Sequence, residues 1–550
     1  MKKLEQDPKA YDAQFTQLTK GINKEVIKWI LHKVNKGESV LEIGCGTGTL
    51  SAKIALKNTM VTAIDKNVQM INYAMKHYPK KEDIKLKYQV GSFRTSSIPE
   101  HSQDIVISKF MLSELGPFEQ QIFLRTAWKL LKPHGRLIIA AEFIPSNFWK
   151  ISFKLKRWWY NKKLKRNNIE RTTPLTNFYE YIDVIGFEII DEYYWNKGSI
   201  RAIELVKKNL NDNTNPGYYK PKPIKYWGIA SSLKILRCVL TGQIDEVPIE
   251  PGIYRSGKPN ETSPVLITAN YAYTFIKVMR DLRGVDAWVV CINSKGINVW
   301  CAARGGDFGN KELIDAIEAT GIDKHVDTNT LILPQLAAGG VSKPELPENS
   351  EVFPFKIKYG PIWSKDLKEY LELPSQKKSE TMKRAKFSLS HRIRAGISHT
   401  TFLLRKIFLI PLIILSITLG VLDYTDVFNI LWFVGYLVIW ILFPNILLLL
   451  LYPLANFTRK FLIKGVIFGV INTILLGIIT WVLKNSFLFM SLNLVFFFWI
   501  GFFTTMSFSG YTMATNPREI QNEYKIFKIL NYILLIGSFS LSFLSIVYII

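Results

Sequence analysis

Charge almost disappears from the chain after about residue 400. Five apolar stretches follow, at roughly 407–422, 427–451, 461–483, 486–508 and 528–550. Each is close to the roughly 20 residues that an α-helix needs to cross a bilayer. Lysine and arginine gather in alternate loops between these stretches. By the positive-inside rule those loops are cytoplasmic, and the residues before the first stretch lie on the same side of the membrane. Residues 405–550 therefore predict an α-helical transmembrane domain of about five spans, in a multi-pass protein of the cell membrane.

Length, charge and cysteine content narrow the remaining possibilities. The 550 residues are enough for several domains. The net charge of +25 is compatible with nucleic acid, but basic residues flank the apolar stretches and so favour an anionic membrane surface. The four cysteines, Cys45, Cys238, Cys291 and Cys301, form no Cys-x-x-Cys pair and no iron–sulfur run. We therefore expect membrane lipids as partners, no nucleic acid, and cytoplasmic soluble domains without disulfides.

The first chemical motif lies at residues 39–48, where a run of Val, Leu and Ile opens into a glycine-rich segment. This pattern predicts a strand followed by a turn whose backbone N–H groups come close to a ligand. A second strand-like run at 60–64 ends in Asp65, whose carboxylate can accept hydrogen bonds from ribose hydroxyls.

The order of these residues resembles class I S-adenosylmethionine-dependent methyltransferases, whereas nicotinamide enzymes usually carry G-x-G-x-x-G. The resemblance implies a Rossmann-like α/β domain over residues 1–210 with S-adenosylmethionine as its cofactor. The residues implied to bind that cofactor are Glu42, Gly44, Gly46, Gly48 and Asp65.

Further landmarks of this first unit agree with the resemblance. Residues 104–108 are strand-like, residues 130–139 resemble the helix–turn–strand of the family, and 178–206 are expected to supply its closing strands. The chain differs at Gly91-Ser92-Phe93, where many relatives carry an acidic residue near the adenine. The sequence indicates neither a catalytic residue in this unit nor its methyl acceptor.

Residues 150–166 interrupt the first unit with lysines and arginines interleaved with Trp and Tyr. Such a segment can stack single-stranded nucleic acid. It can also lie at a membrane interface with its aromatic rings at headgroup level, which the apolar stretches on the same chain favour. A solvated basic helix is the third interpretation.

A second motif surrounds Cys301. Residues 287–292 predict a buried strand, a Ser-Lys-Gly turn follows, and helical spacing of apolar residues resumes at Lys311. Alanines and glycines beside the cysteine allow the backbone to approach a large flat ligand, and a thiolate there can ligate a soft metal. The local pattern alone favours a buried structural cysteine.

Asn298-Val299-Trp300-Cys301-Ala302-Ala303 resembles the cap-helix signature of the mercury methylation corrinoid protein family, which is related to the corrinoid subunits of the acetyl-CoA synthase pathway. The similarity extends over roughly residues 250–370. It implies a second α/β domain, at 211–375, that binds a cobalamin-type corrinoid with Cys301 as the lower axial ligand to cobalt and as the catalytic residue. The other residues implied to bind the corrinoid are Thr268, Asn270, Asn298, Trp300, Ala302, Gly305, Gln335 and Gly339. The chain departs from that family at Arg304-Gly305, where the family has Gly-Lys.

These features combine into one favoured hypothesis. A basic juxtamembrane linker at 376–404 would join the two α/β domains to the membrane. The resemblance implies that methyl is held on cobalt above Cys301 and passed to a soft acceptor such as Hg(II) or a related metal or metalloid. Because the sequence carries no iron–sulfur cysteines, a separate ferredoxin-like electron donor is expected. Whether S-adenosylmethionine or a folate-type donor loads the cobalt stays open.

Two other functions compete with this hypothesis. The protein could be a membrane-tethered S-adenosylmethionine-dependent methyltransferase of a lipid, a quinone or another small molecule, with a degenerate corrinoid-like binding module. Nucleic-acid methylation rests only on the net charge and on Trp158-Trp159.

Overall fold

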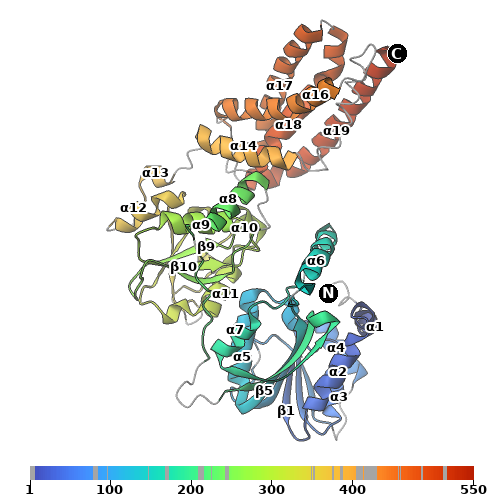
Figure 1. Ribbon diagram of the computed structural model, residues 1–550, viewed down its shortest axis with the longest axis vertical. Coiled ribbons are helices and arrows are strands. Elements are labelled where there is room, and N and C mark those ends of the chain that lie inside the picture. Colours follow the sequence, from blue (N-terminus) through green and yellow to red (C-terminus); the bar gives the residue numbers. More distant parts are fainter. Residues whose placement is uncertain are drawn as a thin grey trace.

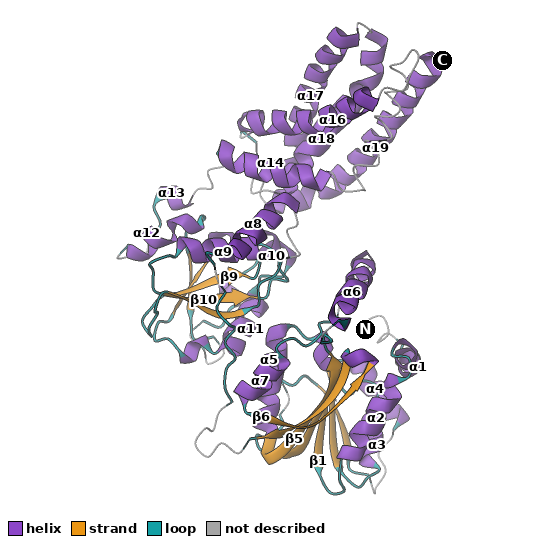
Figure 2. Cartoon of the chain, in the orientation of Figure 1, coloured by secondary structure: helices purple, strands orange, loops and turns teal. Residues whose placement is uncertain are grey.

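The structure is a computed structural model (Figures 1 and 2), in which two α/β domains precede a bundle of helices. It describes residues 7–78, 84–95, 97–146, 148–166, 172–208, 216–224, 226–241, 247–348, 350, 353–373, 377–383, 388–403, 413, 430–455, 457–458, 460–484, 487–511 and 517–549.

The first domain is built on a seven-stranded sheet in the order β3-β2-β1-β4-β5-β7-β6. Strands β1 to β5 are parallel, and β7 is antiparallel to both of its neighbours, β5 and β6. Its strands are β1 (Ser39–Ile43), β2 (Met60–Asp65), β3 (Leu86–Val90), β4 (Gln103–Lys109), β5 (Leu131–Glu142), β6 (Phe187–Trp195) and β7 (Ile200–Lys207). Its helices are α1 (Pro8–Leu18), α2 (Ile22–Lys33), α3 (Thr49–Ala55), α4 (Val68–His77), η1 (Met111–Glu114), α5 (Pro117–Leu130), α6 (Trp149–Arg166) and α7 (Phe178–Ile185). Every residue of β1 is buried, because helices cover both faces of a parallel sheet. The predicted Rossmann-like α/β domain is confirmed.

The second domain is also α/β, as predicted. Its five-stranded sheet has the order β12-β11-β9-β10-β8, in which only the edge strand β8 is antiparallel to its neighbour. Its strands are β8 (Gly252–Ser256), β9 (Val265–Ala269), β10 (Ala287–Ile292), β11 (Thr330–Leu333) and β12 (Lys356–Tyr359). Its helices are α8 (Ile229–Thr241), α9 (Ala272–Asp281), α10 (Val299–Gly305), α11 (Asn310–Thr320), η4 (Gln335–Gly339), α12 (Leu367–Glu372) and α13 (Glu380–Lys383).

The carboxyl ends of β9, β10 and β11 meet at one edge of this sheet, since parallel neighbours end on the same side. That edge carries the motif residues that precede α10 and η4.

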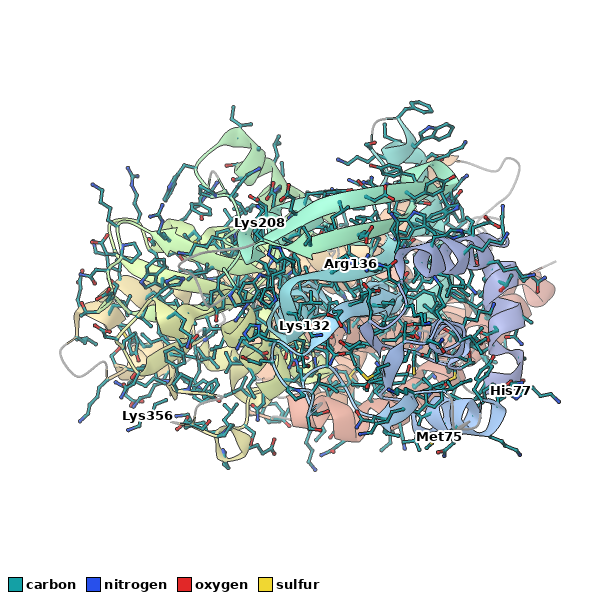
Figure 3. All side chains as sticks on the ribbon, turned by 90° about the horizontal axis from the view of Figure 1, so that it is seen from below. Met75, His77, Lys132, Arg136, Lys208 and Lys356 are labelled. Carbon is teal, nitrogen blue, oxygen red and sulfur yellow. The ribbon has the colours of Figure 1, made fainter. Side chains whose placement is uncertain are left out.

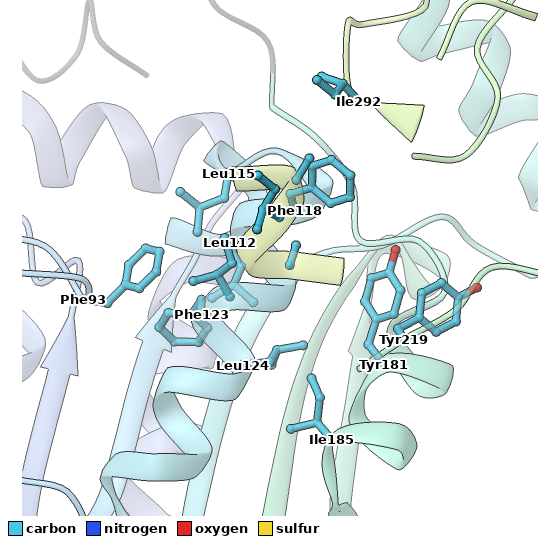
Figure 4. Close-up of a cluster of buried hydrophobic side chains, with 14 of the residues drawn as sticks. Phe93, Leu112, Leu115, Phe118, Phe123, Leu124, Tyr181, Ile185, Tyr219 and Ile292 are labelled. Carbon is cyan, nitrogen blue, oxygen red and sulfur yellow. The ribbon is translucent and has the colours of Figure 1, made fainter. Parts of the chain in front are cut away.

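The two α/β domains pack directly on one another. One continuous cluster of buried apolar side chains takes members from both, including Phe118 of α5 and Ile292 of β10 (Figure 4). Tyr219, in the segment 209–223 that joins the two domains, packs edge-on against Tyr181 of α7, with ring centroids 4.5 Å apart. The described part of that segment is therefore fixed to the first domain, and its residues 209–215 lie outside the described ranges.

Ion pairs reinforce this contact. Arg94 Nη1 lies 2.7 Å from Asp315 Oδ1, and Lys311 Nζ lies 2.8 Å from Glu119 Oε1. Asp315 is buried, so its pair with Arg94 is shielded from the solvent screening that weakens exposed ion pairs. The interface thus sets α5 of the first domain against α11 of the second.

Charged side chains fringe the α/β domains in the view of Figure 3. Arg136 of β5, labelled there, lies 2.6 Å from Glu38 and 2.6 Å from Glu204 of β7. This residue ties β7 to the turn before β1.

The helical bundle contains α14 (Leu389–Leu403), α16 (Ile430–Leu451), α17 (Phe461–Lys484), α18 (Phe487–Tyr511) and α19 (Pro517–Ile549). Buried His399 joins three of these helices, because its ring nitrogens lie 2.8 Å from Asn445 Oδ1 and 2.9 Å from Ser507 Oγ.

Two stretches among the described residues, Phe461–Val482 and Asn522–Leu541, are long and apolar enough to cross a membrane. The predicted first span at 407–422 lies outside the described residues, apart from position 413. Five spans therefore stay a prediction.

Candidate functional site

The first site lies where β1 ends in the glycine-rich turn. Gly44, Gly46 and Gly48 have φ values of +80°, +55° and +76°, which L side chains rarely adopt. A Cβ on Gly44 would lie 2.7 Å from Met111, and one on Gly48 would lie 2.6 Å from the hydroxyl of Tyr88. A Cβ on Gly46 would meet no described atom within 4 Å, so the middle of the turn is the part open to a ligand.

Asp65, at the end of β2, holds this turn in shape. Its Oδ2 accepts a hydrogen bond from the Gly46 N–H at 2.8 Å, and its Oδ1 accepts one from the Asn67 N–H at 2.8 Å. The structure therefore brings two of the predicted cofactor-binding residues, Gly46 and Asp65, into contact.

Glu42 is fully buried beneath the turn. It accepts a hydrogen bond from the Ser51 hydroxyl, and its Oε1 has no hydrogen-bond partner among the described residues. Burial raises the pKa of Glu42 to about 7, and the nearby charge of Asp65 acts in the same direction. Lys109, at the end of β4, attracts the Glu42 carboxylate, and its own pKa is lowered by burial.

Helix α1 also reaches the turn, a contact that the sequence motif does not reveal. The Asp12 carboxylate accepts hydrogen bonds from Thr47 Oγ1 at 2.9 Å and from Thr49 Oγ1 at 2.5 Å. Phe15 packs edge-on against Phe110, which follows β4, with ring centroids 5.1 Å apart. A helix before the first strand thus closes one side of the site.

The adenine side differs from the family pattern, as noted from the sequence. Phe93 is buried and packs edge-on on Phe123 of α5, with ring centroids 5.5 Å apart. Ser92 shares hydrogen bonds with Thr95 in an exposed turn. No acidic side chain takes this position in the chain.

The second site is organised around α10. Asn298 caps the helix, and its Oδ1 accepts a hydrogen bond from the Cys301 N–H at 2.9 Å. Lys295 before the helix lies 2.6 Å from Asp307 after it, so both ends of α10 are tied together. Cys301 is partly exposed, whereas the other three cysteines are buried. It is thus the one cysteine of the chain placed to meet a ligand.

Small residues allow α10 to lie close to η4. Ala302 and Ala303 are buried, and a Cβ on Gly340 would lie 2.6 Å from the Ala303 carbonyl oxygen and 2.3 Å from that of Phe308. Gly305 is exposed at the end of the helix. The alanines of the motif therefore serve close packing of the backbone.

Polar residues at the strand ends have different tasks. The Asn270 side chain donates to the Ile249 carbonyl oxygen at 3.0 Å and accepts from the N–H groups of Ser294 and Gly296 at 2.9 Å each, so it fixes the loop before α10. Thr268 is buried, and its Oγ1 has no hydrogen-bond partner among the described residues.

Two further predicted residues lie on η4. Gln335 Oε1 accepts a hydrogen bond from Lys378 of the segment before α13. A Cβ on Gly339 would meet no described atom within 4 Å, so this position is open.

Trp300 and Arg304 lie on the side of α10 that faces the helical bundle. Trp300 packs against an apolar cluster of bundle residues, and the Arg304 guanidinium lies 5.8 Å from its ring centroid. The buried members of that cluster are Phe461, Phe502, Met506 and Ile520. The Trp300 side chain thus packs on the bundle, whereas the sequence predicted that it binds the corrinoid. Within the described ranges, no group of three or more His, Cys, Asp or Glu side chains is placed to hold a metal ion.

Comparisons with known proteins match a part of each α/β domain. Residues 40–135 match the family described as a methyltransferase domain. The first domain is a methyltransferase domain. Residues 222–347 match the family described as CO dehydrogenase/acetyl-CoA synthase delta subunit. The predicted resemblance to corrinoid subunits of the acetyl-CoA synthase pathway is confirmed, and mercury methylation stays a prediction.

The relatives of the second domain are archaeal. The gamma subunit of the acetyl-CoA decarbonylase/synthase complex from Methanopyrus kandleri is 34% identical over 117 residues, which are 21% of this chain and 25% of that protein. The gamma 2 subunit from Methanosarcina thermophila is 41% identical over 96 residues, which are 17% and 20%. The matched region thus spans a quarter or less of either relative. A solved S-adenosylmethionine-dependent methyltransferase from Methanosarcina mazei is 21% identical, with 32% of this chain and 97% of that chain covered and a TM-score of 0.28.

The pKa of Glu42 gives a testable pH dependence. S-adenosylmethionine carries a sulfonium and an ammonium group, so an ionised Glu42 near its site strengthens binding. Because the pKa of Glu42 is about 7, its charge and therefore the affinity grow as the pH rises from 6 to 8. We expect a rise of about three- to tenfold, measured by calorimetry. Glu42→Gln should flatten the profile, and Glu25→Gln, on the exposed side of α2, should leave it unchanged. A sloped profile in Glu42→Gln would contradict this assignment.

Proposed function

We propose that the protein carries out membrane-bound, corrinoid-dependent methyl transfer, with S-adenosylmethionine bound in the first domain and a corrinoid bound in the second. The observation that supports it most is a contact between the loops of the two sites. A Cβ on Gly116, in the loop after β4, would lie 3.4 Å from Asn293 Nδ2, in the loop after β10. Both loops leave the carboxyl ends of strands, β4 beside β1 in the first sheet and β10 beside β9 in the second, so the domains approach one another near the sheet edges that carry the two sites.

Residues at the second site fit a planar, metal-containing ligand. Thr268 offers an unpartnered buried hydroxyl, Cys301 a partly exposed thiol, and Gly339 an open backbone. Cys301 would ligate the metal, while Asn298 holds the cysteine's backbone and Asn270 holds the loop before it. A bound corrinoid supplies a cobalt centre that takes up and releases methyl, and a thiolate ligand favours release with the bonding electrons, toward a soft acceptor such as Hg(II) or a metalloid.

The proposal includes partners and a location. The helices that are long and apolar enough to cross a membrane support a membrane protein, and the multi-pass arrangement with cytoplasmic α/β domains is part of the proposal. Cobalt must be returned to a low-valent state, and the described residues hold no cluster of metal ligands for that purpose. A ferredoxin-like iron–sulfur protein is the electron donor that we propose.

The test is whether the purified full-length protein carries a corrinoid. We expect detergent-purified protein from a corrinoid-producing host to show corrinoid absorption in the visible range in constant ratio to protein across a sizing column. With a strong reductant present, methyl-labelled S-adenosylmethionine should transfer its label to the corrinoid fraction. Protein that is colourless and takes up no added cobinamide would contradict the proposal.

A second candidate is a membrane-tethered methyltransferase whose second domain has lost corrinoid binding. Two observations favour it, because the Asn270 side chain is used within the protein and Trp300 packs on the bundle rather than over the strand ends. In that case colourless protein would still methylate a lipid, a quinone or another small molecule with S-adenosylmethionine.

A further inference from the structure

Helix α6 projects from the methyltransferase domain on the side of the molecule where the helical bundle lies (Figure 1). Three large apolar side chains on it are strongly exposed: Ile151 at 64%, Leu155 at 58% and Trp159 at 68%. Their spacing of four residues places them along one face, at about 100° per residue. We call this face the α6 stripe.

The opposite face of α6 contacts the methyltransferase domain. Arg157 lies 2.6 Å from Glu142 of β5 and donates to Thr172 Oγ1 at 3.0 Å, and Phe153, one turn earlier, lies beneath its guanidinium at 5.8 Å. Positions 153 and 157 are roughly opposite the α6 stripe on a helical projection. The stripe therefore faces directly away from the domain.

Lysines flank the stripe on both sides. Lys154 and Lys156 are exposed, and helical geometry puts one on each flank of the apolar face. No acidic residue occurs between Glu142 and Glu170, so nothing acidic in this segment offsets their charge. An apolar face bordered by lysines matches a helix that lies in a membrane interface, with apolar side chains among the acyl chains and ammonium groups among phosphates.

The second domain repeats this arrangement on α8, which lies against α14 at the base of the bundle. Ile229, Leu233 and Leu236 form an exposed apolar line, while Cys238 on the far side of the helix is buried. Both α/β domains thus present an exposed apolar helix on the side of the helical bundle.

We propose that the α6 stripe and its flanking lysines dock the methyltransferase domain on an anionic lipid surface. A solvated basic helix does not account for three exposed apolar side chains on the face turned from the domain. The candidate membrane-crossing helices on the same chain bring a bilayer to this side, and anionic lipid complements the lysines. The proposal does not depend on what either site binds.

Hydrogen exchange of the full-length protein in nanodiscs tests this docking. Nanodiscs of equal parts phosphatidylglycerol and phosphatidylcholine are compared with pure phosphatidylcholine nanodiscs. We expect amides at 148–159 to exchange about tenfold more slowly in the anionic nanodiscs, because the anionic headgroups attract the flanking lysines. The triple variant Ile151→Ser, Leu155→Ser, Trp159→Ser should lose that protection.

A matched control removes three exposed apolar residues elsewhere on the same domain, with Leu18→Ser, Leu56→Ser and Met75→Ser. It should keep the lipid-dependent protection, and binding of S-adenosylmethionine checks that both variants are folded. Equal exchange in the two nanodiscs overturns the proposal. So does protection that follows added single-stranded oligonucleotide and not the lipid, which would assign α6 to nucleic acid.

Discussion

Cys301→Ala is expected to remove the thiolate signature from the visible spectrum of the corrinoid-bound protein and to slow methyl transfer by at least about 100-fold. Removal of outer partners of metal ligands alone costs 10- to 100-fold, so loss of the ligand itself should cost more. The side chain is partly exposed on a short helix whose ends are tied by the Lys295–Asp307 ion pair, so its truncation leaves no buried cavity. The altered spectrum should therefore report ligation and not unfolding.

Cys238→Ala is the control for this substitution. Cys238 lies on α8 and is buried beside Tyr271, which follows β9, so this variant removes a neighbouring thiol and keeps Cys301. Its loss should leave both the spectrum and the transfer rate unchanged. A Cys301→Ala protein with the wild-type spectrum would show that the corrinoid, if bound, takes its axial ligand elsewhere.

The sequence predicted the elements that bear local signals. The turn at Gly44–Gly48 and Asp65 could be placed because strand runs and glycines have fixed consequences for the backbone. The strand at 287–292 and the helix from Lys311 could be placed from apolar spacing, whereas α10 around Cys301 was implied only by the family resemblance.

Contacts between distant segments had no such signal. Asp12 accepts a hydrogen bond from Thr47, although a helix and a strand separate them in the sequence. Trp300 packs against a cluster that includes Phe461, 161 positions later in the sequence. Such pairings follow from the packing of whole elements, which periodicity does not encode. Lys109 was within reach of sequence reasoning, because a charged residue at the end of a parallel strand lies at the ligand edge of the sheet.

Asp65→Ala is expected to weaken binding of S-adenosylmethionine by about 100-fold or more. Its carboxylate holds the N–H groups of Gly46 and Asn67, both at 2.8 Å, and hydrogen bonds to charged groups contribute about 1.5–3 kcal/mol each. Loss of about 3 kcal/mol corresponds to roughly 100-fold in affinity. Calorimetric titration of the full-length protein in detergent measures it. Asp183→Ala, at an exposed position on α7, should bind normally.

Asp65→Asn separates the two tasks of this carboxylate. The amide keeps one oxygen as an acceptor, so it can retain one of the two backbone hydrogen bonds but not both. Its affinity should fall between those of the wild type and Asp65→Ala. If both variants bind as the wild type does, the glycine turn is held by its own φ values and not by Asp65.

Asp65→Ala also distinguishes the role of the donor site from that of the second site. Asp65 lies in the first domain and Cys301 in the second, so Asp65→Ala should leave any corrinoid spectrum unchanged while transfer from S-adenosylmethionine is lost. Cys301→Ala should do the reverse, changing the spectrum while S-adenosylmethionine binds normally. If Asp65→Ala leaves transfer to the final acceptor intact, the second domain receives methyl from another donor, such as a folate. The contact of Gly116 with Asn293 would then serve only to join the domains.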